Sequence, residues 1–342
     1  MTTAVNWHDI LKFDGFGGGR EIASEVRLNC PEFTGEDIYG NRFNIGAAQA
    51  TISQDYVEGL IRKETTPVDV FRDVNEGVRT SKGEYERTLF KLYNAGSYVR
   101  YDRALIDRDK ARGARLMEAE ATRVLENAIR TLGTQFFYGG VEGSGASKKG
   151  FQGLQKFVGD DFVLDAGGSW GGTSALTSAY FVRFNEVDGV SWLFGRDGRF
   201  YLSDVVEKDV PDPSDPEKTI PVYQQFLEFY PGFGYFSKYA AVRVANVDVS
   251  TAATPGGISS TAFTDEHILV ALEKFKGARP DALFMSRKAG ILLAASRRPT
   301  IEISGTTIST GSVALPNEVY GVPILYTDSL VENEKAWSTE SV

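Results

Sequence analysis

The sequence Thr131-Leu-Gly-Thr-Gln-Phe-Phe-Tyr-Gly139, followed at residues 150–154 by Gly-Phe-Gln-Gly-Leu, decides how this chain folds. Three consecutive aromatic residues and a glycine end a long stretch of mixed charge, and a second Gly-Leu pair follows a glycine-rich bend. The pattern predicts one long helix that ends against a β-rich remainder. We therefore expect Phe136 and Phe137 to be buried within a single copy of the chain.

The segment Asp102–Phe137 carries the clearest helical pattern. Apolar residues recur close to a 3.6-residue period, and charged residues occupy the remaining faces. Glu126 and Arg130 are spaced i, i+4 in the favourable order. At 1.5 Å per residue the helix would be about 50 Å long, although Gly113 costs it about 1 kcal/mol relative to alanine. A long surface helix of an ordinary globular domain is the alternative reading.

The segments before this helix follow different patterns. Residues 1–35 show no sustained hydrophobic periodicity. This pattern predicts an extended arm that is held in place only if another segment or chain covers it. Residues 37–51 suggest a short hairpin around Gly40-Asn41. Residues 62–100 form a long, highly charged block with turn residues at Asn75–Gly77. A two-stranded hairpin of this kind is only marginally stable by itself, so it needs a neighbouring segment or chain to hold it.

Beyond the helix the residue pattern changes twice along the chain. Residues 151–249 read as β-rich, with short aromatic and β-branched runs between glycine-rich turns. Thr264 and Ser286 then cap two predicted helices on either side of a buried strand at 282–285. These features predict an α/β lobe, and they are followed by a late strand at 319–326 and a polar tail from Glu332.

Composition excludes several classes of function. The chain has 342 residues and a formal net charge of −9, which disfavours a sequence-independent grip on nucleic acid or on anionic membranes. Cys30 is the only cysteine and reads as a buried filler. His8 and His267 are the only histidines, and no run of about 18 apolar residues predicts a membrane span.

The motifs that carry catalytic or metal chemistry are weak. Gly167–Gly171 matches the nucleophile elbow with Ser169 at its centre, but the residues that follow are poor helix formers. Residues 140–150 lack the lysine position of a phosphate loop. Three aspartates lack the glycine and glutamate of a calcium loop, at Asp209, Asp212 and Asp215. We expect no metal, no cofactor and no enzymatic site.

Five local sequences, met in chain order, resemble those of one family. They are Phe71–Gly77, Phe137–Gly139 with Phe151–Leu154, Ala241–Asp248, Gly321–Ile324, and Thr327-Asp328. Together with the order of arm, charged hairpin, long helix, β-rich middle and α/β lobe, they resemble the HK97-fold major capsid proteins of tailed phages over nearly the whole length.

The resemblance implies an α+β fold divided into six parts. They are an N-arm (1–35), peripheral-domain strands (36–54), an extended loop (55–100), a spine helix with the peripheral domain (101–174), an axial domain (175–315), and a closing strand with C-terminal tail (316–342). It implies a coat protein that self-assembles as pentamers and hexamers into an icosahedral shell around the double-stranded DNA genome of a tailed phage.

The resemblance also implies partners and contact residues. On the extended loop, Arg62, Arg72, Arg79 or Arg87 would pair with acidic residues of a neighbour's spine helix, and Asp73 and Glu76 complete the candidate contact set. A separate scaffolding protein, a portal protein and possibly a decoration protein are expected. The chain would enclose DNA without sequence-specific binding, contact no membrane, and assemble in the host bacterial cytoplasm into the virion. A covalent link from Lys82 to Asn317 or Asn333 is not favoured.

Three other functions stay open at this point. An encapsulin-like nanocompartment shell shares the fold that the resemblance implies. A serine hydrolase would use Ser169. A tail or adhesin-like binding module would use the aromatic, β-rich middle of the chain.

Overall fold

The structure is a computed structural model. It describes residues 29–44, 49–52, 55–62, 71–77, 83–108, 110–140, 149–168, 175–195, 200–212, 215, 217–253, 262–277, 279–297, 300–303, 306–309 and 314–338. Among these residues, no helix is both long and apolar enough to cross a membrane.

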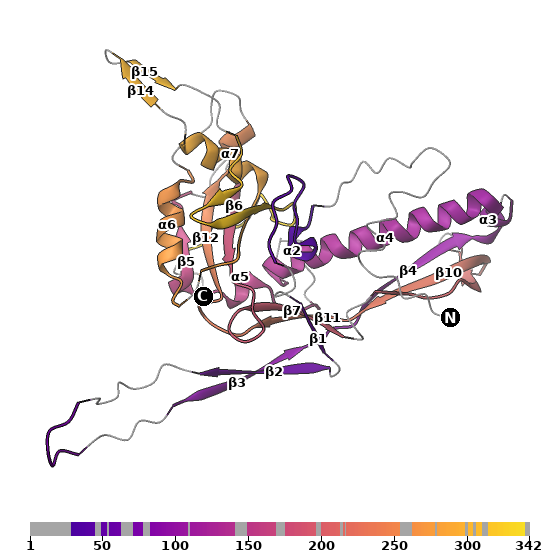
Figure 1. Ribbon diagram of the computed structural model, residues 1–342. Coiled ribbons are helices and arrows are strands. Elements are labelled where there is room, and N and C mark those ends of the chain that lie inside the picture. The colour runs from indigo at the N-terminus through magenta and orange to yellow at the C-terminus, as the bar shows by residue number, and fades with distance from the viewer. Residues whose placement is uncertain are drawn as a thin grey trace.

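One long helix dominates the structure, as the sequence predicts (Figure 1). Helix α4 (Lys110–Tyr138) has 29 residues and follows the short helix α3 (Arg103–Arg108). Four shorter α-helices are described elsewhere: α2 (Pro31–Thr34), α5 (Leu154–Phe157), α6 (Asp265–Glu273) and α7 (Arg287–Ser296). Two 3-10 turns, η3 (Asp160–Phe162) and η5 (Ser250–Ala253), complete the helical elements.

The largest sheet forms the core of the lobe beside the end of α4 (Figure 1). It has six strands in the order β16 (Glu318–Val319), β17 (Val322–Tyr326), β13 (Ala282–Met285), β6 (Leu176–Val182), β12 (Ala241–Asp248) and β5 (Val163–Asp165). One face packs against α6 and α7 through apolar residues such as Phe181, Ile268 and Leu292.

Local capping explains the lobe's helices. The backbone N–H of Thr264 donates to Nδ1 of His267 at 3.2 Å, and Ser286 Oγ accepts from the Ala289 N–H at 3.3 Å. Both caps are confirmed. In β12 the residues from Ala241 to Val247 are buried throughout, because the end of α4 and the neighbouring aromatic cluster cover the face opposite α6 and α7.

The remaining strands form smaller sheets. A four-stranded sheet runs along α4 (Figure 1) and contains β4 (Ala95–Asp102), β10 (Thr219–Phe229), β8 (Tyr201–Leu202) and β9 (Val206–Pro211). A three-stranded sheet contains β1 (Gln49–Ile52), β7 (Val190–Gly195) and β11 (Pro231–Tyr235). Two hairpins stand apart: β2 (Tyr56–Arg62) with β3 (Tyr85–Lys91), and β14 (Thr300–Ile303) with β15 (Thr306–Ser309).

The aromatic end of α4 joins two of these sheets. Phe136 lies 4.9 Å from Trp192 of β7 and 6.3 Å from Phe284 of β13, measured between ring centroids. Phe137 lies 5.7 Å from Phe284 and 5.3 Å from Tyr180 of β6. Both side chains are fully buried, which confirms that part of the prediction. The junction contacts the six-stranded sheet as well as the smaller one.

The glycines at this junction allow the chain to turn back on itself. Gly139 has a φ of +54°, and a Cβ there would lie 1.6 Å from the backbone nitrogen of Gly153. The Gln135 side chain donates to the Phe151 carbonyl at 2.6 Å. The Phe-Tyr-Gly and Phe-Gln-Gly-Leu sequences therefore lie side by side, because only glycines permit so close a backbone approach.

The structure differs from the sequence-based expectations in the first half of the chain. The end of the expected arm belongs to the folded body: Cys30 and Phe33 are buried, and α2 packs beside α4. Residues 1–28 lie outside the described residues. The expected hairpin at 37–51 is reduced to a turn closed by the Glu36–Arg42 bridge. Strand β1 pairs in parallel with β7 instead.

Two further expectations are wrong in extent. Residues 95–100 do not continue the charged hairpin, because β4 pairs antiparallel with β10 beside α4. The C-terminal residues are not a loose polar tail: Glu334 is buried, and Trp337 packs against the aromatic cluster. Both corrections arise from partners that lie far away in sequence.

Candidate assembly surfaces

The β2–β3 hairpin projects from the body, and the turn at residues 71–77 lies at its far end (Figure 1). The base of the hairpin is anchored, because Phe90 is buried and its ring lies 5.0 Å from that of Phe236. Outward from the base, Tyr85 and Leu89 are exposed. A two-stranded ribbon of this kind gains little stability from its own contacts.

The turn presents apolar side chains to solvent. Phe71 is 94% exposed and Val74 is 93% exposed, which makes them the most exposed large apolar residues described. The turn is held by contacts among its own residues: the Asp73 N–H donates to the side-chain Oε2 of Glu76 at 2.9 Å, and Asn75 adopts a φ of +70°. The sequence pattern showed the turn, but it did not show that its apolar residues face outward.

The structure brings together only part of the predicted contact set. Arg72, Asp73 and Glu76 share the exposed turn at 71–77. Arg87 lies farther back on β3 and pairs with Glu58 of β2, a hydrogen bond that raises the pKa of its guanidinium. Arg62 ends β2, and its side chain lies outside the described residues, as does Arg79.

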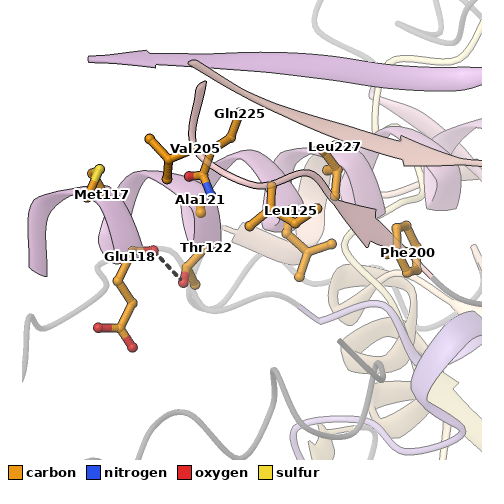
Figure 2. Close-up of a pocket in the computed structure, with 10 residues that line it drawn as sticks. Met117, Glu118, Ala121, Thr122, Leu125, Phe200, Val205, Gln225 and Leu227 are labelled. Atoms are coloured by element: carbon orange, nitrogen blue, oxygen red, sulfur yellow. Dashed lines mark hydrogen bonds between the residues drawn. The ribbon is translucent and has the colours of Figure 1, made fainter. Parts of the chain in front are cut away.

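A groove lies between α4 and the four-stranded sheet (Figure 2). Its volume is about 220 Å³, and most of its lining is apolar. Met117, Ala121 and Leu125 line it from successive turns of α4, and Phe200 and Leu227 line it from the sheet side. The i, i+4 spacing in α4 predicted a buried face. The groove itself was missed because its second wall comes from residues 200–227.

Glu118 stands at the rim of this groove (Figure 2). Its backbone carbonyl accepts from Thr122 Oγ1 at 2.9 Å, and its side chain is exposed. Within the described part of the chain, Glu118 makes no ion pair, whereas the nearby Glu120 pairs with Arg123 at 2.7 Å. The groove therefore combines an apolar floor with an available carboxylate.

The C-terminal segment is held by a buried ion pair. Arg243 of β12 pairs with Glu334 at 2.8 Å, and its Nε donates to Ser178 Oγ at 2.9 Å. The Tyr138 hydroxyl donates to the same carboxylate, and burial together with the Glu334 charge raises the pKa of Tyr138. Because these four side chains are linked by hydrogen bonds in one cluster, the arrangement fastens the chain end to the body.

The residues considered for chemistry that the structure describes have structural roles. Ser169 lies outside the described residues, and the chain after it enters β6 at Leu176 where the elbow would need a helix. His267 serves as a helix cap, and Asp215 pairs with Lys218 at 2.9 Å. The described residues contain no cluster of three or more His, Cys, Asp or Glu side chains suited to a metal ion.

Comparison with solved structures shows the fold. The capsid structure of bacteriophage Epsilon15 matches with a TM-score of 0.59 and 16% identity over 98% of this chain and 97% of that chain. The bacteriophage JBD30 capsid matches with a TM-score of 0.44 and 11% identity over 90% and 96%. An encapsulin complex from Synechococcus elongatus PCC 7942 matches with a TM-score of 0.43 and 9% identity over 68% and 93%.

The fold is thus the α+β HK97 fold, and a family model assigns the chain to the structural proteins of capsids, not to the enzymes. The family model for the major capsid protein GP7 matches residues 54–338, and the chain belongs to this family. It is therefore a major capsid protein and a component of the virion. No curated protein matches the sequence.

Proposed function

We propose that this chain assembles as pentamers and hexamers into an icosahedral shell that encloses the double-stranded DNA genome of a tailed phage. The observation that carries this proposal is the projecting β2–β3 hairpin, whose end exposes Phe71 and Val74. A lone subunit gains nothing from such a hairpin, whereas copies in a closed lattice can cover it.

The hairpin end fits the groove beside α4 of a neighbouring copy. Phe71 and Val74 supply unpartnered apolar side chains, and the groove supplies an unfilled apolar lining. Arg72 stands next to Phe71 in the sequence, and Glu118 stands at the groove rim, so a cation meets an available carboxylate when the two surfaces dock. On this proposal, Arg72 makes the predicted arginine contact with the Glu118 carboxylate.

Magnitudes decide which of these contacts dominates. Full burial of a phenylalanine contributes about 1.5–3 kcal/mol, whereas an exposed ion pair contributes about 0–1 kcal/mol. The apolar end should therefore supply most of the affinity, and the charges should set the register. Repetition around a closed shell multiplies a modest gain for each subunit into a stable particle.

Substitution of the apolar end tests the proposal. We expect Phe71→Ser with Val74→Ser to leave the subunit folded but to reduce the yield of closed particles in negative-stain microscopy and sedimentation. Phe71→Leu is the matched control, because it keeps an apolar side chain and should assemble. Normal particle yield from the double variant would overturn the proposed role of the hairpin end.

The groove is tested separately. Ala121→Glu places a charge among the lining residues and should block assembly, whereas Thr131→Glu on the exposed face of α4 should not. Arg72→Glu and Glu118→Arg should each weaken assembly, and the two together in one chain should restore it. Unchanged assembly after charge reversal at Arg62, Arg72, Arg79 and Arg87 together would exclude the whole arginine hypothesis.

The expected partners and contents belong to the same proposal. A separate scaffolding protein, a portal protein and possibly a decoration protein would join the shell during assembly in the host cytoplasm. The net charge of −9 supports a wall that encloses DNA without holding it tightly. Particles purified from infected cells should protect phage DNA from nuclease, whereas particles filled with a cargo protein would contradict a genome container.

A further inference from the structure

A second buried carboxylate has a different environment from Glu334. Glu32 of α2 is fully buried, and its two oxygens accept from hydroxyls of the closing segment: Oε2 from Thr327 Oγ1 at 2.9 Å and Oε1 from Ser329 Oγ. No arginine, lysine or histidine forms an ion pair with it among the described residues. The carboxyl therefore meets only neutral donors, and burial raises its pKa from 4.5 to about 7.

The carboxyl also lies directly on the backbone of the long helix. A Cβ at Gly133 of α4 would stand 2.3 Å from Glu32 Oε1 and 2.2 Å from Ser329 Oγ. The Trp192 indole donates to the Glu32 carbonyl at 3.0 Å. Glu32 thus joins three parts of the chain: residues 29–35, residues 327–329, and the end of α4.

The hydroxyls around Glu32 can serve both of its protonation states. When the carboxyl is ionised, Thr327 and Ser329 both donate to it. When it is neutral it can donate to one of them, and each hydroxyl has a second acceptor: Thr327 Oγ1 lies 3.5 Å from the Asn29 carbonyl, and Ser329 Oγ lies 3.5 Å from Cys30 Sγ. The network therefore does not force one charge state.

Asp328 is a charged group that acts on Glu32 and favours its neutral form. It acts as a like charge, although its carboxylate also binds Arg287 of α7 at 2.6 Å. Arg130 of α4 acts on Cys30 as a cation that lowers the pKa of the thiol. Burial raises the pKa of the Cys30 thiol, so the thiol stays protonated. Glu32 is the group in this cluster that changes charge near neutral pH.

We propose that Glu32 is a proton-operated latch: its neutral form holds residues 29–35 against residues 327–329 and α4, and loss of the proton loosens that contact. The proton passes to solvent, and no covalent bond changes. The pH then sets how firmly residues 29–35 are anchored to the body. This inference concerns contacts within one chain and does not depend on the proposed shell geometry.

Amide hydrogen exchange tests the latch in the full-length chain between pH 5.5 and 8.5. The reporter is the Asp328 amide, which donates to the Asn29 carbonyl at 3.1 Å, and the reference is the Val249 amide, which donates to Ala175 at 2.8 Å. After correction for intrinsic rates, protection of Asp328 should fall by up to about tenfold per pH unit as the pH rises from 5.5 to about 7, and it should level off above that. Val249 should stay constant over that range.

Three variants make the test specific. Glu32→Gln removes the titrating group and should give protection that does not depend on pH. Thr327→Val removes a donor to the ionised form and should move the midpoint to higher pH, and Cys30→Ala should leave it unchanged. A pH-independent wild type, or the same pH dependence in Glu32→Gln, would overturn the latch. If Glu32→Gln fails to fold, the wild-type profile and the Thr327→Val midpoint still decide.

Discussion

Phe136 and Phe71 are the same kind of residue in opposite environments. Phe136 ends the long helix and is fully buried among aromatic rings of two sheets, whereas Phe71 is 94% exposed at the end of a projecting hairpin. The first is stabilised entirely by its own chain. The second lies almost wholly outside the apolar interior of one copy. The comparison separates residues that build the subunit from residues that we propose to bind a neighbouring copy.

Among the substitutions considered, Phe136→Ala should cause the largest loss of stability in the subunit. The substitution leaves a cavity among Trp192, Phe233 and Phe284, so we expect a loss of about 3–5 kcal/mol in the free energy of unfolding. Chemical denaturation of the unassembled chain measures it. A loss below 1 kcal/mol would mean that the junction does not hold the two sheets together.

Removal of the buried Arg243 side chain should cause the second largest loss of stability. Arg243→Met leaves the Glu334 carboxylate buried without its partner, which costs about 3–5 kcal/mol when the charge cannot escape to solvent. The C-terminal segment can detach and relieve part of that cost, so the expected loss is the lower end of this range. Faster proteolysis after residue 327 would accompany it, and Arg243→Met with Glu334→Met should recover stability.

The pH dependence of unfolding sharpens the contrast between Glu334 and Glu32. The pKa of Glu32 is raised to about 7 in the folded protein, above its ordinary 4.5, so the folded state holds the proton more tightly. Its contribution to stability is therefore greatest below pH 4.5 and is lost as the pH rises to about 7, by about 3 kcal/mol in total. The difference in the free energy of unfolding between wild type and Glu32→Gln across this pH window measures the contribution of Glu32, because the contributions of the other carboxylates cancel in that difference.

The smallest effect on stability should come from the hairpin end. Phe71→Ala removes no contact within the chain, so we expect a change within about 0.5 kcal/mol. Particle yield should nevertheless fall, as argued for the double serine variant. A large loss of stability in the unassembled chain would show that Phe71 packs within its own subunit and would erase the contrast with Phe136.

Local features of the sequence predicted much of this fold. The 3.6-residue period located α4, and Thr264 and Ser286 marked the helix starts, because these signals depend on residues within one or two turns. The order of these elements also supported the resemblance to the HK97 capsid family. The candidate contact surface was found only in part: its turn residues were visible in the sequence, but the groove that we propose as its binding site was not.

By itself the sequence determined where helices, turns and apolar runs lie, since capping and periodicity act over a few residues. Only the tertiary structure decided that Glu334 meets Arg243 across 91 residues, that β4 pairs with β10, and that Glu32 meets Thr327 across 295 residues. The physical reason is that burial and charge pairing depend on which distant segments share the interior. Those segments are brought together by the sheets and by the aromatic end of α4.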